Sequence, residues 1–81
     1  MPHRYRSDVL TQLADHGIRP TPETRPELVH EYLNDLYRYE LRRLRDQLLK
    51  REILKVDYSE HVLHVRRRYP LLSLKTWQWM E

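Results

Sequence analysis

Apolar side chains recur at helical intervals along most of the chain, most clearly in residues 26–53. This segment holds no glycine and no proline beyond Pro26, and its apolar positions follow at steps of 4, 4, 4, 3 and 4. The stripe consists of Val29, Leu33, Tyr37, Leu41, Leu44 and Leu48, widened by Tyr32 and Leu36. These steps predict an amphipathic helix of about seven turns. They do not follow the seven-residue repeat of a left-handed coiled coil.

A short helix is expected before this long one, over residues 8–16. Val9 and Leu13 lie four residues apart, as on one face of a helix. Ser7 is a candidate N-cap, and Gly17, the only glycine in the chain, stands where a left-handed C-cap favours it. Nine residues do not hold a helix in water by themselves, so this element must pack against another part of the molecule.

A third helix is expected over residues 58–68. Asp57 or Ser59 can cap its start, and Pro70 restricts the residue before it and so ends the helix. Its apolar face comprises Val62, Val65 and Tyr69. We expect this helix to turn back on the long one and form a helical hairpin.

The remaining segments differ in composition. Residues 1–6 are basic and predict a loose N-terminus, whereas residues 18–25 hold two of the five prolines and predict an extended linker. That linker ends in a capping box, with Thr24 three residues before Glu27, and Pro26 suits the first helical turn.

The C-terminal segment, residues 70–81, is unusually apolar for a chain end, which is normally polar and frayed. We expect it to be extended and to dock, either on the long helix or on another molecule. Trp77 and Trp79 alternate as residues on one side of an extended segment do.

Length and composition support one all-α domain over residues 1–81. The chain is too short for two independent cores. It has no cysteine, which excludes disulfides and cysteine-ligated metals, and its single glycine excludes Gly-rich phosphate loops. No apolar run approaches the roughly 20 residues that span a bilayer, and no secretory signal is evident. We therefore expect a cytoplasmic protein.

Residue chemistry gives no basis for an enzyme, a cofactor, a metal site or a small-molecule substrate. His61 and His64 lie three residues apart and can share a metal in principle, but nothing near them in sequence completes a ligand set. Ser7, Ser59 and Ser73 suit caps and turns better than catalysis. We predict a protein that is not an enzyme and binds no cofactor.

The apolar stripe from Val29 to Leu48 offers more surface than two short helices can cover, which indicates a partner. Tyr, Trp and Arg, the types enriched at binding hot spots, are frequent in this chain. We therefore predict a non-catalytic protein–protein interaction module, either a homodimer or a small accessory subunit of a larger assembly. The predicted interface consists of Tyr39, Leu49, Ile53, Leu71, Leu72, Leu74, Trp77 and Trp79.

Charge supports an alternative, a nucleic-acid (RNA or DNA) binding factor. The net charge is +3, twelve of the fifteen cations are arginine, and residues 36–55 carry +4 against −3 in residues 21–35. The candidate contacts are Arg42, Arg43, Arg45, Arg66, Arg67 and Arg68. The competing explanation is a solvated helix face with intrahelical ion pairs, such as Asp35 with Arg38 and Glu40 with Arg43.

Leu36-Tyr37-Arg38 resembles the signature of the LYR-motif proteins, which are small basic helical accessory factors. Members of that family bind acylated acyl carrier protein and assist the assembly of iron–sulfur proteins or respiratory complexes, so the resemblance implies an assembly factor as a third function. It covers three of 81 residues. The family carries its motif near the N-terminus with a phenylalanine downstream, whereas this motif begins at position 36 and the chain has no phenylalanine.

Overall fold

The computed structural model describes residues 2–81, and it confirms the all-α fold and the helical hairpin. The helices are α1 (Ser7–Asp15), α2 (Pro26–Leu49) and α3 (Lys55–Arg67), followed by two 3₁₀ turns, η1 (Pro70–Ser73) and η2 (Thr76–Trp79). The molecule is elongated, measuring 50 × 18 × 16 Å. No helix within residues 2–81 has the length and apolar character needed to cross a bilayer.

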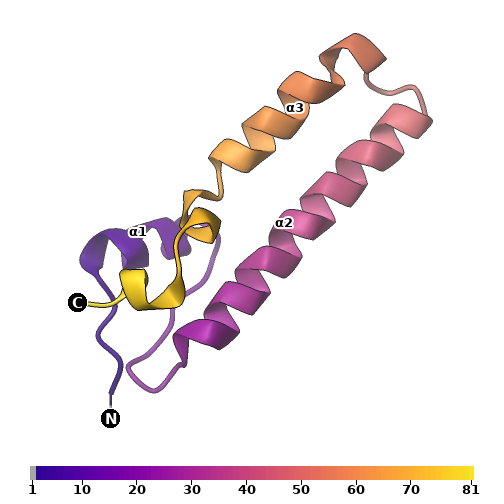
Figure 1. Ribbon diagram of the computed structural model, residues 1–81. Helices are drawn as coiled ribbons and strands as arrows, with labels where there is room; N and C mark the ends of the chain where they lie inside the picture. The colour runs from indigo at the N-terminus through magenta and orange to yellow at the C-terminus, as the bar shows by residue number, and fades with distance from the viewer. Residues whose placement is uncertain (1) are drawn as a thin grey trace.

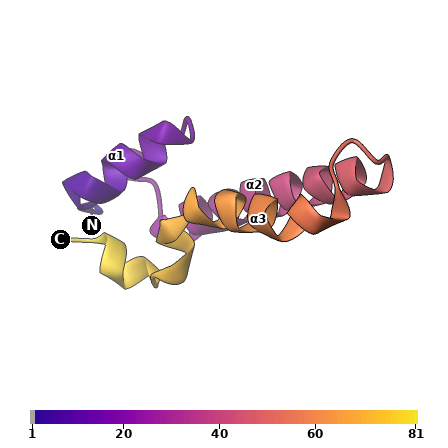
Figure 2. The ribbon, with the colours of Figure 1, turned by 90° about the horizontal axis from the view of Figure 1, so that it is seen from above.

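The fold has two regions, which we call the base and the arm. In the base, residues 2–35 and 69–81, α1 and both 3₁₀ turns gather beside the first half of α2 (Figure 1). The arm, residues 36–68, is the rest of α2 with α3 running back beside it. Seen from above, the arm extends away from α1 as a pair of helices (Figure 2). Both chain termini lie at the base (Figure 1).

The C-terminal segment docks on the chain's own base. Trp79 is fully buried, and its Nε1–H donates a hydrogen bond to the Leu71 carbonyl over 3.2 Å. The segment forms 3₁₀ turns rather than the extended structure that the sequence suggested. As a result Trp77 and Trp79 do not share a side, because Trp77 is 71% exposed. One tryptophan therefore belongs to the core and the other to the surface.

The N-terminal segment, for which the sequence predicts a loose start, makes backbone hydrogen bonds to the rest of the base from residue 3 onward. The Arg6 N–H donates to the Trp79 carbonyl over 2.9 Å, and the Glu81 N–H donates to the Arg4 carbonyl over 2.8 Å. Tyr5 is buried, and its hydroxyl donates to the Thr24 carbonyl. Met1 lies outside the described residues. The two chain ends thus hold each other, and this pairing closes the base.

Both α1 and α2 end in a Schellman motif, in which a left-handed residue terminates the helix. Gly17, at φ 76°, ends α1 as predicted, with the Ile18 N–H bonded to the Leu13 carbonyl over 2.9 Å. Arg51, at φ 59°, does the same for α2, with the Glu52 N–H bonded to the Gln47 carbonyl over 2.9 Å. Because Arg51 leaves the right-handed region, α2 stops at Leu49 and does not reach residue 53.

The expected side-chain caps do not form. Neither Ser7 nor Thr24 caps a helix, and Thr24 Oγ1 instead accepts a hydrogen bond from the Thr21 N–H. The third helix begins at Lys55 rather than near residue 58, which leaves Asp57 inside its first turn, where a carboxylate favours the helix dipole. Pro26 does occupy the first turn of α2, as predicted.

The apolar stripe of α2 is covered unevenly by its own chain. Val29 and Leu33 are buried, with η1 and η2 packed along α2, while further along the helix Leu44 is buried against the α3 side of the hairpin. The stripe residues between them, Leu36, Tyr37 and Leu41, are half-buried. The C-terminal segment of the same chain therefore helps to cover Val29 and Leu33, whereas Tyr32 stays 56% exposed.

Candidate protein-interaction surface

Large apolar side chains are exposed mainly along the helical hairpin. Nine such side chains are exposed among the described residues, and seven of them, between 45% and 79% exposed, lie on α2, on α3 or in the turn between them. These seven are Leu28, Tyr32, Tyr39, Leu49, Leu54, Val56 and Leu63. Scattered apolar residues on a surface are ordinary, but several along one side of a protruding element mark a candidate binding surface.

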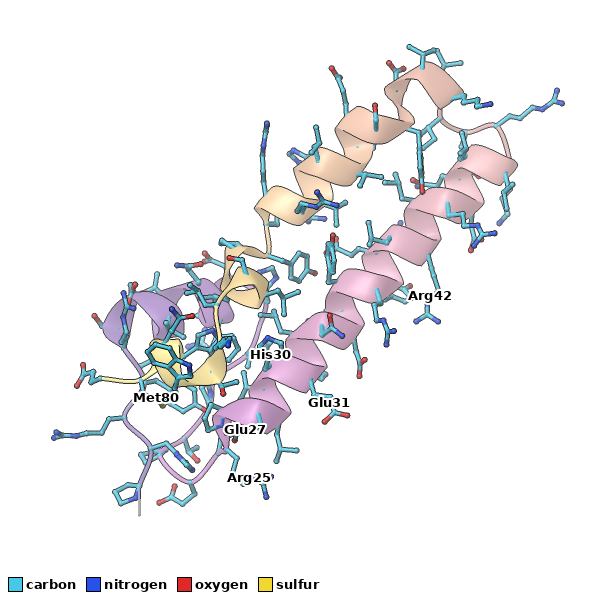
Figure 3. All side chains as sticks on the ribbon, in the orientation of Figure 1. Arg25, Glu27, His30, Glu31, Arg42 and Met80 are labelled. Atoms are coloured by element: carbon cyan, nitrogen blue, oxygen red, sulfur yellow. The ribbon has the colours of Figure 1, made fainter. Side chains whose placement is uncertain are left out.

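Four of these residues lie on the side of α2 that faces away from α3, which we call the outer α2 face. At 3.6 residues per turn, Leu28, Tyr32 and Tyr39 fall within about 40° of one another, roughly opposite buried Leu33 and Leu44. Leu49 lies at the edge of the same face. Glu31 and Arg42 also point away from α3 on this side (Figure 3). The outer face is thus a free surface along the whole helix.

The predicted interface residues separate into three groups. Tyr39, Leu49 and Trp77 are exposed, and Ile53, Leu72 and Leu74 are half-buried. Leu71 and Trp79 are 3% and 0% exposed, so they belong to the core of the base and cannot contact a partner without unfolding it. The apolar tail was expected to be a docking element, and the surface it docks on belongs to this same chain.

Sequence reasoning missed several of the exposed residues. It assigned Tyr32 to the buried stripe, placed Leu63 beside the apolar face of the third helix, and did not consider Leu28, Leu54 and Val56. The spacing of Leu28, Tyr32 and Tyr39 is helical but rotated away from the main stripe. This offset around the helix axis is the sequence feature that could have indicated a second apolar surface facing outward.

All six candidate nucleic-acid contacts are exposed, and five make no ion pair. Within residues 2–81 the only ion pairs are Arg6 with Asp8 and Arg68 with Glu40. The intrahelical pairs expected on α2, such as Asp35 with Arg38, do not form. The arm carries ten cations against five carboxylates, a net charge of +5, whereas the base carries −2. The positive charge is therefore concentrated on the arm and is largely unneutralised.

The arginines do not converge on one face. Arg43 and Arg68 line a groove together with Glu40, whose carboxylate already pairs with Arg68. Arg67 lines a different groove beside His61 and His64. A ligand lying in either groove would meet only part of the arginine set.

A polar cluster joins the arm to the base. The Tyr69 hydroxyl and the Arg68 guanidinium both donate to the Glu40 carboxylate, and the His16 ring stacks on Tyr69 with centroids 4.4 Å apart. His16 Nε2 also lies 2.7 Å from the Arg68 carbonyl, which makes this nitrogen a donor. Burial, together with the hydrogen bond to Glu40, raises the pKa of Tyr69 to about 12. These contacts fix the hairpin on the base, which is a structural role.

The possible metal ligands of the described residues do not gather into one site. No group of three or more His, Cys, Asp or Glu side chains within residues 2–81 is arranged to hold a metal ion. His61 and His64 are both exposed. The hollow they line is an open groove on the surface of α3.

The Leu36-Tyr37-Arg38 segment lies in the middle of α2. Tyr37 is half-buried and packs at a tilt on Tyr69, with ring centroids 5.3 Å apart. Leu36 is half-buried, and Arg38 is exposed beside Asp35 and Arg42. Packing of the hairpin therefore accounts for the tyrosine of this motif.

Comparison with known proteins adds no relationship to this geometry. No family model, no curated protein and no solved structure matches the chain. The resemblance to LYR-motif proteins thus remains limited to the three residues of the motif.

Proposed function

We propose that this protein is a non-catalytic interaction module that binds another protein through the outer α2 face, as a homodimer or as a small accessory subunit. The base is held together by hydrogen bonds between the two chain ends and by burial of the apolar C-terminal segment. The arm projects from it with a surface that the chain itself leaves open.

One observation carries this proposal. Tyr32, Tyr39 and Leu49 are 56%, 59% and 70% exposed on one side of a well-formed helix, next to arginines without carboxylate partners. Tyrosine and arginine gain more than most residues from burial in an interface, because each combines a large apolar or planar body with hydrogen-bonding groups.

The test compares the full chain with a variant of the outer α2 face. The variant carries Leu28→Asp, Tyr39→Asp and Leu49→Asp, and the matched control carries Leu10→Asp on α1, which is also exposed. Self-association is measured by sedimentation velocity, and capture of other proteins is measured on nuclease-treated extract. Circular dichroism verifies that each variant is folded.

We expect the wild-type chain to associate with itself or with a specific protein. The triple variant should lose this association, and Leu10→Asp should keep it. The proposal is overturned if the wild-type chain stays monomeric and also captures no protein that the triple variant loses.

Nucleic-acid binding is the second candidate, favoured by the net charge of +5 on the arm. Its test is a fluorescence anisotropy titration with single-stranded and duplex RNA and with duplex DNA, repeated at increasing salt. A true phosphate-binding surface loses affinity steeply as salt rises, because counterions must be released. Replacing Arg42, Arg43 and Arg45 with glutamine should weaken binding at least tenfold. Dissociation constants above about 1 mM at low salt would exclude this candidate.

A further inference from the structure

We infer that the outer α2 face binds a second copy of this chain, with the two α2 helices antiparallel and Tyr39 at the twofold axis. This inference rests on the proposed function and names its partner. It follows from the order of residues along the outer face, which is chemically self-complementary when one helix is reversed against another.

The outer face follows a regular spacing that the buried stripe lacks. Seven exposed residues follow each other at alternating steps of 4 and 3, the repeat by which helices pack along a shared seam. They are Leu28, Tyr32, Asp35, Tyr39, Arg42, Asp46 and Leu49. This series spans 22 residues, or about 33 Å of helix. The length is ample for a contact between two helices.

The series is also nearly symmetric about Tyr39. In an antiparallel pair centred there, Tyr39 meets Tyr39 of the second copy, and Leu28 lies level with Leu49 of the second copy. By the same symmetry, Asp35 lies level with Arg42 of the second copy. In each of these pairs, the positions of the two residues along the helix axis differ by no more than one residue's rise, about 1.5 Å. An isologous dimer requires this kind of self-complementary patch.

Charge favours the antiparallel direction over the parallel one. The first half of α2 carries Glu27, Glu31 and Asp35, and the second half carries Arg42, Arg43 and Arg45. Reversing one helix brings each acidic half beside a basic half, whereas a parallel pair would place like charges together. The unpaired arginines of α2 would thereby find carboxylates that their own chain does not supply.

Nucleic acid fits this particular face less well than a second copy does. Asp35 and Asp46 stand in the series itself, and Glu31 lies beside it (Figure 3). A phosphate backbone would meet these carboxylates at close range and be repelled. In the antiparallel pair Asp35 instead lies level with Arg42 of the second copy, while Asp46 lies level with the Tyr32 hydroxyl.

The experiment is sedimentation equilibrium of the full chain at about physiological salt, where exposed charges are screened over roughly 8 Å. The wild-type chain is expected to dimerise. Tyr39→Asp places two carboxylates together at the axis and is expected to weaken dimerisation at least tenfold. The matched control is Leu63→Asp on α3, an exposed apolar residue outside the proposed interface, which should leave the dimer unchanged.

Exchanging the charges of Asp35 and Arg42 tests the register of the two antiparallel helices. Asp35→Arg alone sets two arginines level with each other, and Arg42→Asp alone sets two aspartates level, so each should weaken the dimer severalfold. The double variant with both changes restores opposite charges and should recover dimerisation to within about threefold of wild type. Circular dichroism of each variant separates loss of contact from loss of fold.

A wild-type chain that stays monomeric at millimolar concentration overturns this inference. So does a dimer that Tyr39→Asp leaves intact, or a double variant that fails to recover. The proposed function would survive these results if the triple variant of the outer face lost a different protein partner, so the two failures can be told apart.

Discussion

The base and the arm of this small protein are built in opposite ways. All four fully buried side chains, Val9, Leu13, Leu33 and Trp79, lie in the base. The most buried residues of the arm, Leu44 and Val65, are 7% and 8% exposed. The base therefore has a core enclosed by several segments, whereas the arm has one seam between two helices. Stability is concentrated where the chain ends meet, and the arm is left free to present a surface.

Charge separates the same two regions. The base carries a net charge of −2 and the arm +5, with the Arg68–Glu40 pair as the one ion pair inside the arm among the described residues. Repulsion among the arm's cations opposes close packing of its helices, and it is relieved when carboxylates from elsewhere approach. The arm thus combines a thin core with uncompensated positive charge, whereas the base combines an enclosed core with a small negative charge.

The most damaging single change should be Trp79→Ala at the base. Removing this fully buried ring leaves a cavity and is expected to cost about 3–5 kcal/mol, a large part of a small domain's stability. Urea unfolding followed by circular dichroism measures the loss. Trp77→Ala is the control, because that exposed side chain should change stability by less than about 0.5 kcal/mol. Similar losses from the two variants would contradict the assignment of Trp79 to the core.

The next largest effects should come from Leu33→Ala in the base and Leu44→Ala in the arm. Leucine-to-alanine changes in cores cost about 2–5 kcal/mol, depending on how far the site can collapse. We expect the loss for Leu33→Ala to lie near the upper end of this range, because Leu33 is fully buried. The loss for Leu44→Ala should lie near the lower end, because the two helices of the arm can close around the smaller side chain. Equilibrium unfolding of both variants gives the comparison. Equal losses would show that the arm is as tightly packed as the base.

Alkaline pH should weaken the junction between the two regions. The pKa of Tyr69 is raised to about 12, first by burial and then by its hydrogen bond to Glu40. Because the folded-state pKa exceeds the ordinary tyrosine pKa of 10.0, this tyrosine's contribution to stability is complete below pH 10. It is lost as the pH rises from 10 through 12. Thermal unfolding between pH 9 and pH 12 measures the decline.

Tyr69→Phe is the matched variant for this effect. We expect it to be less stable than wild type at neutral pH, because the hydroxyl no longer donates to Glu40. Its stability should fall less steeply above pH 10. The remaining slope includes Tyr5 in the base, whose pKa is also raised, first by burial and then by Glu27. A decline as steep as that of wild type would show that Tyr69 does not carry the pH dependence.

The smallest effects should come from the two helix ends. Gly17→Ala in the base is expected to cost about 1 kcal/mol, because alanine is strained at φ 76° although space is free around it. Arg51→Gly in the arm should raise stability by about 1 kcal/mol or less, since glycine relieves the same strain at φ 59°. Thermal unfolding of the two variants should show shifts of opposite sign. A loss of stability in Arg51→Gly would indicate that the arginine side chain makes a contact of its own.

Much of the fold could be predicted because it depends on neighbours along the chain. Steps of three and four between apolar residues predicted α2 and the hairpin, and Gly17 predicted the end of α1. Side-chain caps were less predictable, since Thr24 hydrogen-bonds to Thr21 instead of to the helix. The end of α2 was missed because a left-handed arginine is uncommon, and its residue type gives no warning of it.

The candidate surface was predictable only in part. Tyr39 and Leu49 were identified from the sequence and are exposed, but Leu71 and Trp79 were assigned to the same surface and are core residues. Hydrophobicity alone does not distinguish an apolar residue that meets its own chain from one that meets another. Whether these apolar residues are buried or exposed depends on the path that the C-terminal segment takes after Pro70 in the folded structure.

The order of residues by itself determined the helices, the place of Pro26 in the first turn of α2, and the opposite charges of the two halves of that helix, because each depends on spacing or on neighbouring residues. Tertiary structure alone decided that the chain ends pair and that Trp79 is buried while Trp77 is not. It also decided that the outer α2 face stays open. The physical reason is that burial depends on contacts between distant segments, and these exist only once the chain has folded.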